Sequence, residues 1–138
     1  MSRTPLPHNH GDALRLVLEH MPAEGEFTCC AETFRQLGDP SRLRVLWLLC
    51  HCEDCGINLA SALGMSHAAV SHHLKVLRLH GLITSRRSGK EIYYTLADTQ
   101  AARLVHQMVD DIFRLACPTK GLWDHPYGTA EEDGRPNP

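Results

Sequence analysis

The sequence lacks features that several large classes of protein require. Its longest uninterrupted apolar run covers six residues, Val45 to Cys50, whereas a membrane-spanning helix needs about 18 or more. Pro5, Pro7 and Arg15 interrupt the N-terminal region, which therefore does not resemble a secretory signal. The sequence also contains no Gly-rich phosphate-binding loop and no nucleophile motif. We therefore expect a cytoplasmic protein that is not an enzyme, with no organic cofactor and no membrane partner.

An excess of positive charge is missing as well. The 14 Lys and Arg residues are outnumbered by 16 Asp and Glu residues, which gives a formal net charge of -2. Between Cys55 and Lys90, however, there is no carboxylate at all. Five cations occur in this stretch: Lys75, Arg78, Arg86, Arg87 and Lys90. A basic region on an otherwise acidic chain is typical of a surface that contacts nucleic-acid phosphates.

The spacing of apolar residues predicts a mostly helical domain with a small β-hairpin. We expect one folded domain over residues 12–118, a flexible N-terminal tail over 1–11 and a flexible acidic C-terminal tail over 119–138. The predicted helices cover 14–21, 28–37, 40–50, 56–63, 67–80 and 98–116, and the predicted strands cover 82–87 and 91–96.

Some boundaries and core positions can be assigned to particular residues. Asp39 and Asp98 are the expected caps of two helices, and Ser88-Gly89 is the expected hairpin turn. Three side chains of the 40–50 helix are expected in the core: Leu43, Leu46 and Trp47.

Residues 56–74 have the layout of a helix-turn-helix. Ala60 is small enough for a close approach of two helices, Gly64 lies at the bend, and Met65 and Val70 fill the angle between the helices. Ser66 can cap the second helix, which enters the major groove in such motifs. The candidate DNA contacts of this helix are Ser66, His67, Ser71, His72 and Lys75. The hairpin tip would form a wing that adds Arg86, Arg87 and Lys90.

Several linked motifs carry a family resemblance. The stretches GDPSRLRVLWLL, AVSHHLKVLRLHGLI and GKEIYYTL resemble the ArsR/SmtB family of winged-helix, metal-sensing bacterial repressors, in the same order and spacing, from about Phe34 to Ala116. The resemblance implies a winged helix-turn-helix homodimer held by its first and last helices. It also implies a palindromic double-stranded DNA operator that is released when an inducer binds.

The cysteines are too few for a dense disulfide scaffold, and their clustering indicates metal or redox chemistry. Many family members carry Glu-Leu-Cys-Val-Cys-Asp-Leu before the recognition helix, whereas here the stretch Glu53–Leu59 keeps only Cys55 and has Ile57 in place of the second cysteine. Cys50 and Cys30 share faces with apolar residues, so each is either a ligand or a core residue. The candidate metal ligands are Cys29, Cys30, Cys52 and Cys55.

These thiols favour a particular class of inducer. Thiolates prefer soft or borderline ions, so we expect As(III) or a soft divalent ion such as Cd(II), Pb(II) or Zn(II). The expected function is that of a repressor that releases DNA when its thiolates capture such an ion. The alternative is a repressor of the same fold that senses thiol oxidation or sulfur species through Cys50 and Cys117.

The resemblance also points to a second zinc site, on the last helix, that we expect to be absent. Of the four positions implied, Asp98 is retained, while the others hold Gln100, Asp111 and the cation Arg114. His106 lies nearby, but a single helical histidine is more often a surface or core residue than a ligand.

Overall fold

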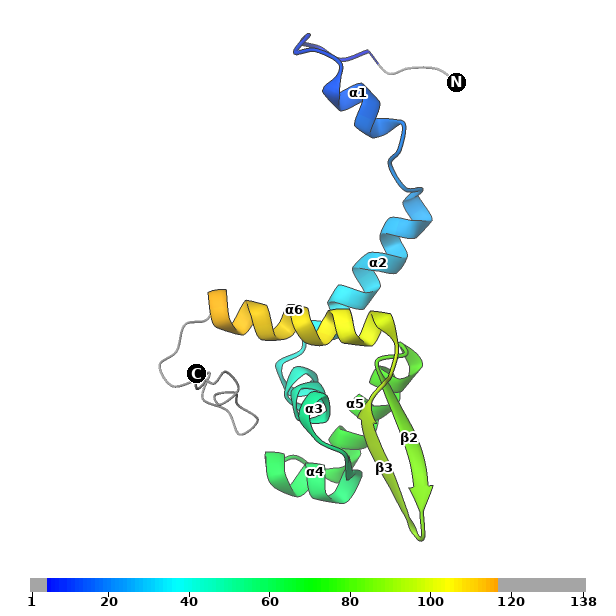
Figure 1. Ribbon diagram of the computed structural model, residues 1–138, viewed down its shortest axis with the longest axis vertical. Helices are drawn as coiled ribbons and strands as arrows, with labels where there is room; N and C mark the ends of the chain where they lie inside the picture. Colours follow the sequence, from blue (N-terminus) through cyan, green and yellow to red (C-terminus); the bar gives the residue numbers. More distant parts are fainter. Residues whose placement is uncertain (1–4, 117–138) are drawn as a thin grey trace, which may run out of the picture. The chain divides into compact units, whose positions relative to one another are not determined.

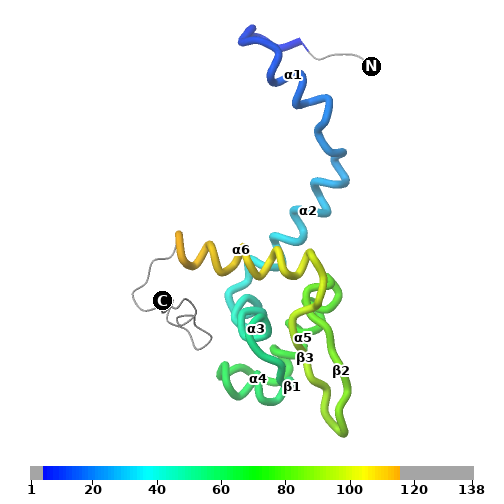
Figure 2. The backbone as a smooth tube through the Cα atoms, in the orientation of Figure 1, coloured from blue at the N-terminus to red at the C-terminus, as the bar shows by residue number. Residues whose placement is uncertain are grey.

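The computed structural model describes residues 5–116 and divides into two units at the Phe34–Arg35 junction, each of which is described by itself. The predicted tail 119–138 and Cys117 lie outside the described residues. Figures 1 and 2 show the elements. They are α1 (Ala13–Leu18), α2 (Glu24–Leu37), α3 (Pro40–His51), β1 (Asp54–Cys55), α4 (Gly56–Leu63), α5 (His67–Leu79), β2 (Ile83–Ser88), β3 (Glu91–Leu96) and α6 (Gln100–Ala116).

The first unit contains α1 and most of α2. Helix α2 begins at Glu24, four residues before the predicted start, because acidic residues in its first turn favour a helix N-terminus. The carboxylate of Glu26 accepts a hydrogen bond from the Ala23 backbone N–H at 2.8 Å, which satisfies a donor ahead of the helix. None of the residues described in α1 and α2 is buried, and Leu14, Val17 and Phe27 are exposed.

Helix α3 begins where the sequence predicts. The side chain of Asp39 accepts hydrogen bonds from the backbone N–H groups of Ser41 and Arg42, at 2.9 and 3.2 Å, and these bonds lower the pKa of the carboxyl group. The expected core face is only partly right, because Leu43 and Trp47 are half-buried. The fully enclosed apolar side chains of α3 are those of Val45, Leu46 and Leu49.

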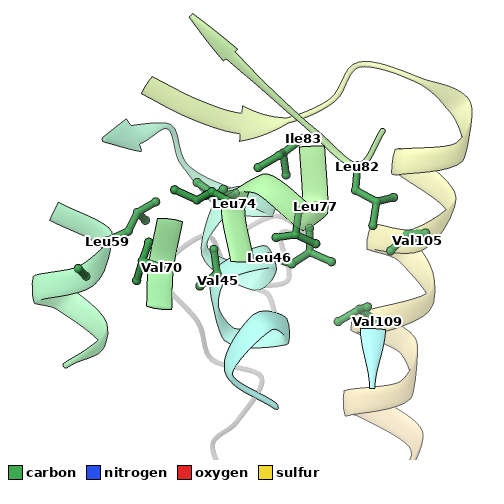
Figure 3. Packing of buried hydrophobic residues seen from close by; sticks show 12 residues of the cluster. Val45, Leu46, Leu59, Val70, Leu74, Leu77, Leu82, Ile83, Val105 and Val109 are labelled. Carbon is green, nitrogen blue, oxygen red and sulfur yellow. The ribbon is translucent and has the colours of Figure 1, made fainter. Parts of the chain in front are cut away.

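A single apolar cluster unites α3 with the elements around it (Figure 3). Leu46 from α3, Leu77 from α5 and Ile83 from β2 are almost completely buried. Val105 and Val109 point from α6 toward this cluster from one side. The full set of buried members is Val45, Leu46, Leu49, Leu59, Ala60, Val70, Leu74, Leu77, Leu82, Ile83, Val105 and Val109.

The predicted hairpin forms, and a short third strand joins it. Strands β2 and β3 pair antiparallel around a two-residue loop at Gly89 and Lys90, where Gly89 has a φ of 65° that favours glycine. The turn therefore lies one residue beyond the predicted Ser88-Gly89. Strand β1, which the sequence analysis did not predict, pairs with the other edge of β3 and completes the order β1-β3-β2.

Helix α6 is capped by a different residue from the one expected. The hydroxyl of Thr99 accepts a hydrogen bond from the Ala102 N–H at 3.1 Å, whereas Asp98 pairs with Arg103 at 2.6 Å. The outer face of α6 carries large apolar side chains that this chain leaves exposed: Leu104, Ile112 and Leu115. None of the helices in residues 5–116 combines the length and the hydropathy needed to cross a membrane.

Leu77→Ala should lower the free energy of unfolding by about 2–5 kcal/mol, because Leu77 is 0% exposed and its truncation leaves a cavity in the common core. Leu79→Ala is the matched control on the same helix, since Leu79 is 74% exposed, and it should change stability by less than about 0.5 kcal/mol. Urea denaturation at one fixed protein concentration measures both values. Equal losses in the two variants would contradict this account of the core.

Candidate nucleic-acid interface and thiol sites

The turn between α4 and α5 is built by two residues with local roles. Gly64 ends α4 in the left-handed conformation, at a φ of 66°, while the N–H of Met65 donates to the carbonyl of Ala60 at 2.9 Å. Ser66 then starts α5, as predicted, by accepting a hydrogen bond from the Ala69 N–H at 3.1 Å. Ala60 and Val70 are buried between the two helices. These contacts set the angle of a helix-turn-helix.

Helix α5 has one buried face and one exposed face. Val70, His73, Leu74 and Leu77 point inward. The five candidate DNA contacts of the motif are all exposed: Ser66, His67, Ser71, His72 and Lys75. The structure therefore places the predicted residues together on one accessible face that carries hydroxyl, imidazole and ammonium groups.

The inner face of α5 is held to the start of α3 by a buried polar pair. Arg42 Nε donates to His73 Nδ1 at 3.2 Å, and a second guanidinium nitrogen donates to the backbone carbonyl of Gln36 at 3.2 Å. Burial lowers the pKa of His73, and the charge of Arg42 lowers it further. The imidazole therefore stays neutral and accepts through Nδ1, which secures the orientation of α5.

The wing presents fewer free cations than the sequence suggests. Arg87 and Lys90 are exposed and no ion pair of theirs is found among the described residues. Arg86 instead forms a bidentate pair with Glu53, with both N–O distances at 2.8 Å, and lies over the ring of Tyr93 at 4.9 Å. The paired charges lower the pKa of Glu53 and raise the pKa of Arg86.

The Cys52–Cys55 segment is attached to the wing through several contacts. Cys55 pairs with Tyr93 in the sheet, and Thr95 on β3 donates through its hydroxyl to the carbonyl of Cys52 at 3.4 Å. The Glu53–Arg86 pair is a third contact, and it joins residues 33 positions apart in the sequence. A displacement of this segment must therefore also disturb the wing.

Comparison with known proteins agrees with this architecture. The sequence profile of the family described as "Bacterial regulatory protein, arsR family" matches residues 39–85. The chain is 37% identical over 106 residues to a transcriptional repressor SmtB homolog from Synechocystis, covering 77% of this chain and 80% of that protein. The chain belongs to the ArsR/SmtB family. Its members among these relatives are transcriptional regulators, not enzymes.

Two further relatives of this ArsR/SmtB chain bear on its assembly and its chemistry. A homolog of the cadmium resistance regulatory protein CadC from Staphylococcus aureus is 33% identical, over 56% of this chain and 64% of its own length. A homodimeric winged helix-turn-helix DNA-binding domain from Mycobacterium bovis matches with a TM-score of 0.53 and 29% identity, over 77% of this chain and 92% of that domain. The mostly helical, winged fold expected from the sequence is confirmed.

The candidate metal-binding thiols have different surroundings in this ArsR/SmtB chain. Cys29 and Cys30 are exposed on α2, so a core role for Cys30 finds no support within the first unit. Cys52 is also exposed, with Sγ at 3.2 Å from the carbonyl of Leu48, and burial followed by the charge of Asp54 raises its pKa. Among residues 5–116, no three potential ligand atoms that include a thiol lie close enough to hold an ion.

Cys55 differs from expectation because it has a packing role. It is only 6% exposed and lines a pocket of about 280 Å³ together with three of the candidate DNA contacts, His67, Ser71 and Lys90. Its pairing in β1 places Cys55 beside β3 of the wing, and this strand is not evident from the sequence because only two residues form it. The thiol thus lies next to candidate DNA contacts of α5 and of the wing.

The redox alternative depends on Cys50 and Cys117, of which only Cys50 is described. Cys50 is half-buried and packs against the core of α3. Burial, together with the charge of Asp110, raises the pKa of Cys50 to about 12. A thiol with such a pKa is almost entirely protonated near neutrality and is a poor nucleophile, which weighs against a redox role.

Cys50 should resist alkylation in the folded protein. At pH 8 a thiol of pKa about 12 is ionised in only about one molecule in 10⁴, so iodoacetamide should modify exposed Cys52 well before Cys50. Peptide mass spectrometry after timed exposure follows each site, and the urea-unfolded protein provides the control in which the two rates converge. Faster modification of Cys50 in the folded state would contradict its buried, protonated state.

Proposed function

We propose that this chain is a homodimeric repressor that binds a palindromic operator and releases it when its thiolates capture As(III) or a soft divalent ion. The observation that carries the proposal is the position of Cys55. This potential ligand shares a pocket with His67, Ser71 and Lys90, all of them candidate DNA contacts. An ion bound at Cys55 would therefore displace the neighbouring DNA contacts directly, because the two proposed sites adjoin each other.

DNA recognition is assigned to α5 and the wing. The exposed side chains Ser66, His67, Ser71, His72 and Lys75 would enter the major groove, while Arg87 and Lys90 would contact the backbone beside it. Arg86 would contribute less than its neighbours, because Glu53 already neutralises much of its charge. In a twofold-symmetric homodimer each protomer would present this surface once, so the dimer would recognise two inverted half-sites.

The dimer is supported by apolar surface that one copy leaves uncovered. Leu104, Ile112 and Leu115 project from α6, and monomeric proteins rarely leave large contiguous apolar areas in water. Within the first unit, α1 also carries exposed apolar side chains, among them Leu14, Leu16 and Val17. The homodimeric M. bovis domain with a similar fold supports the same assembly.

The inducer would be bound by Cys55 with Cys52, Cys29 and Cys30. Three thiolates satisfy the pyramidal coordination of As(III), and four satisfy tetrahedral Cd(II) or Zn(II). Because Cys55 is buried in the described state, coordination would require the β1 segment to move, and β1 is paired with β3 of the wing. A coupling free energy of about 1–3 kcal/mol, typical of such linkage, weakens DNA binding by about 5–150-fold.

The phosphate contacts can be tested through salt dependence. Arg87→Ala should weaken binding of a labelled operator duplex and reduce the slope of log K against log [salt] by about one, because one phosphate contact is lost. Glu53→Gln should have the opposite effect, since it removes the anion that pairs with Arg86 of the wing and frees that cation. Fluorescence anisotropy at several salt concentrations measures both slopes. An unchanged slope in both variants would argue against this interface.

The inducer site can be tested in the same assay under reducing, anaerobic conditions. Cys55→Ser and Cys55→Ala should bind the duplex like the wild type but should no longer release it when As(III) or Cd(II) is added. Cys117→Ser is the control, because the proposed site tolerates its loss whereas the redox alternative requires it. Normal release by both Cys55 variants would remove Cys55 from the site, and loss of release in Cys117→Ser would favour the redox alternative.

A further inference from the structure

A second group of potential metal ligands lies where the end of α3 meets the middle of α6. His51 is the last residue of α3, and His106 and Asp110 are one turn apart on α6. One ligand atom from each of these residues lies within 4.8 Å of the other two. His106 Nε2 is already 3.0 Å from the Asp110 carboxylate, and the His51 and His106 rings meet edge to face at 5.1 Å between centroids.

The environment of this group is more enclosed than that of a surface cluster. The Nε2 atoms of His51 and His106 are both shielded from solvent, and all three side chains are half-buried. The ring of Trp47 lies 4.5 Å from that of His51, and buried Val105 and Val109 flank the α6 residues. Two imidazoles and a carboxylate that are close together and partly withdrawn from water form a donor set that a cation can satisfy, because burying polar groups without a partner costs free energy.

The donor set defines the kind of ion. Two imidazole nitrogens and one carboxylate oxygen suit borderline divalent ions such as Zn²⁺, Co²⁺ and Ni²⁺, and they offer As(III) no sulfur. Around an ion with bonds of about 2.0–2.1 Å, tetrahedral ligand atoms lie about 3.3 Å apart. The His106–Asp110 distance of 3.0 Å is already close to this spacing, so His51 has to approach by at most about 1.5 Å, which rotation of a side chain can supply.

The position differs from the last-helix zinc site that the family resemblance implies. Two residues of that pattern take part in ion pairs here, because Asp98 pairs with Arg103 and Asp111 pairs with Arg114. His106 and Asp110 lie on the inner side of α6, toward α3, beside Val105 and Val109. His106, which the sequence suggests is a surface or core residue, is half-buried and lies beside Asp110 and the ring of His51.

We propose that His51, His106 and Asp110 form a binding site for a divalent ion of the Zn²⁺, Co²⁺ and Ni²⁺ class that clamps the end of α3 to α6. The site contains no sulfur and is separate from the thiolate site proposed above. A fourth coordination position remains for water. Because His51 directly precedes Cys52, an ion here would stiffen the point from which the thiol segment and β1 emerge.

Cobalt titration of the purified, reduced full-length chain tests the site. Co²⁺ bound at this site by nitrogen and oxygen should give visible d–d absorption of its own, whereas the near-ultraviolet charge-transfer bands of cobalt thiolates report on the cysteines alone. His106→Gln and Asp110→Asn should abolish this spectrum and weaken Zn²⁺ binding, measured by calorimetry, by more than the roughly 10–100-fold loss seen for outer-shell partners. His80→Gln is the matched control, since His80 is exposed at the end of α5, outside the group.

Further measurements distinguish loss of ion binding at this site from misfolding and from loss of the thiolate site. Circular dichroism verifies that Asp110→Asn, which keeps the size of the side chain, is folded, and nitrogen NMR of the wild-type imidazoles should show His51 and His106 shifting on addition of Zn²⁺. As(III) should still release DNA from His106→Gln. Cobalt spectra that contain only thiolate bands, or unchanged Zn²⁺ binding in both variants, would overturn the proposal while leaving the thiolate site intact.

Discussion

The packing of α3 at the centre of the second unit is the constraint on which the other features depend. Val45, Leu46 and Leu49 are almost fully buried, and α3 contacts α4, α5, β3 and α6. Its N-terminus holds the inner face of α5 through the Arg42–His73 pair, and its C-terminus leads directly into the cysteine segment. A change at either end of α3 therefore reaches the candidate DNA-binding face through bonded or tightly packed neighbours, because a close-packed core transmits strain.

Much of this fold was predictable from local signals. The Asp39 and Ser66 caps and the left-handed Gly64 each act within a few residues of their own position, so their effect is visible in the sequence. The change from helical to alternating spacing likewise located the wing. Strand β1 was not predicted because it is only two residues long and forms only by pairing with β3, about forty residues later in the sequence. The burial of Cys55 follows from that pairing and was missed for the same reason.

The candidate DNA-binding residues show the same division between local and distant information. The exposed face of α5 was predicted correctly because helical period alone separates His67 and Ser71 from buried Val70. The charge of Arg86 was overrated because its partner, Glu53, lies outside the stretch without carboxylates and 33 residues away. His51 and His106 were not connected at all, because α3 and α6 come together only in the folded chain.

The end of α3 brings two kinds of chemistry to neighbouring residues. His51 faces nitrogen and oxygen ligands on α6, while Cys52 starts the thiol segment that runs into β1. An ion held by His51 would restrain α3, whereas coordination of Cys55 requires β1 to leave its pairing with β3. An ion at His51 would therefore hold the connection between α3 and β1 in place, whereas an ion at Cys55 would displace it. Since coupling between sites is reciprocal, a divalent ion on the proposed α3–α6 clamp should weaken binding of an ion at the proposed thiolate site to the same extent that the thiolate-bound ion weakens binding at the clamp.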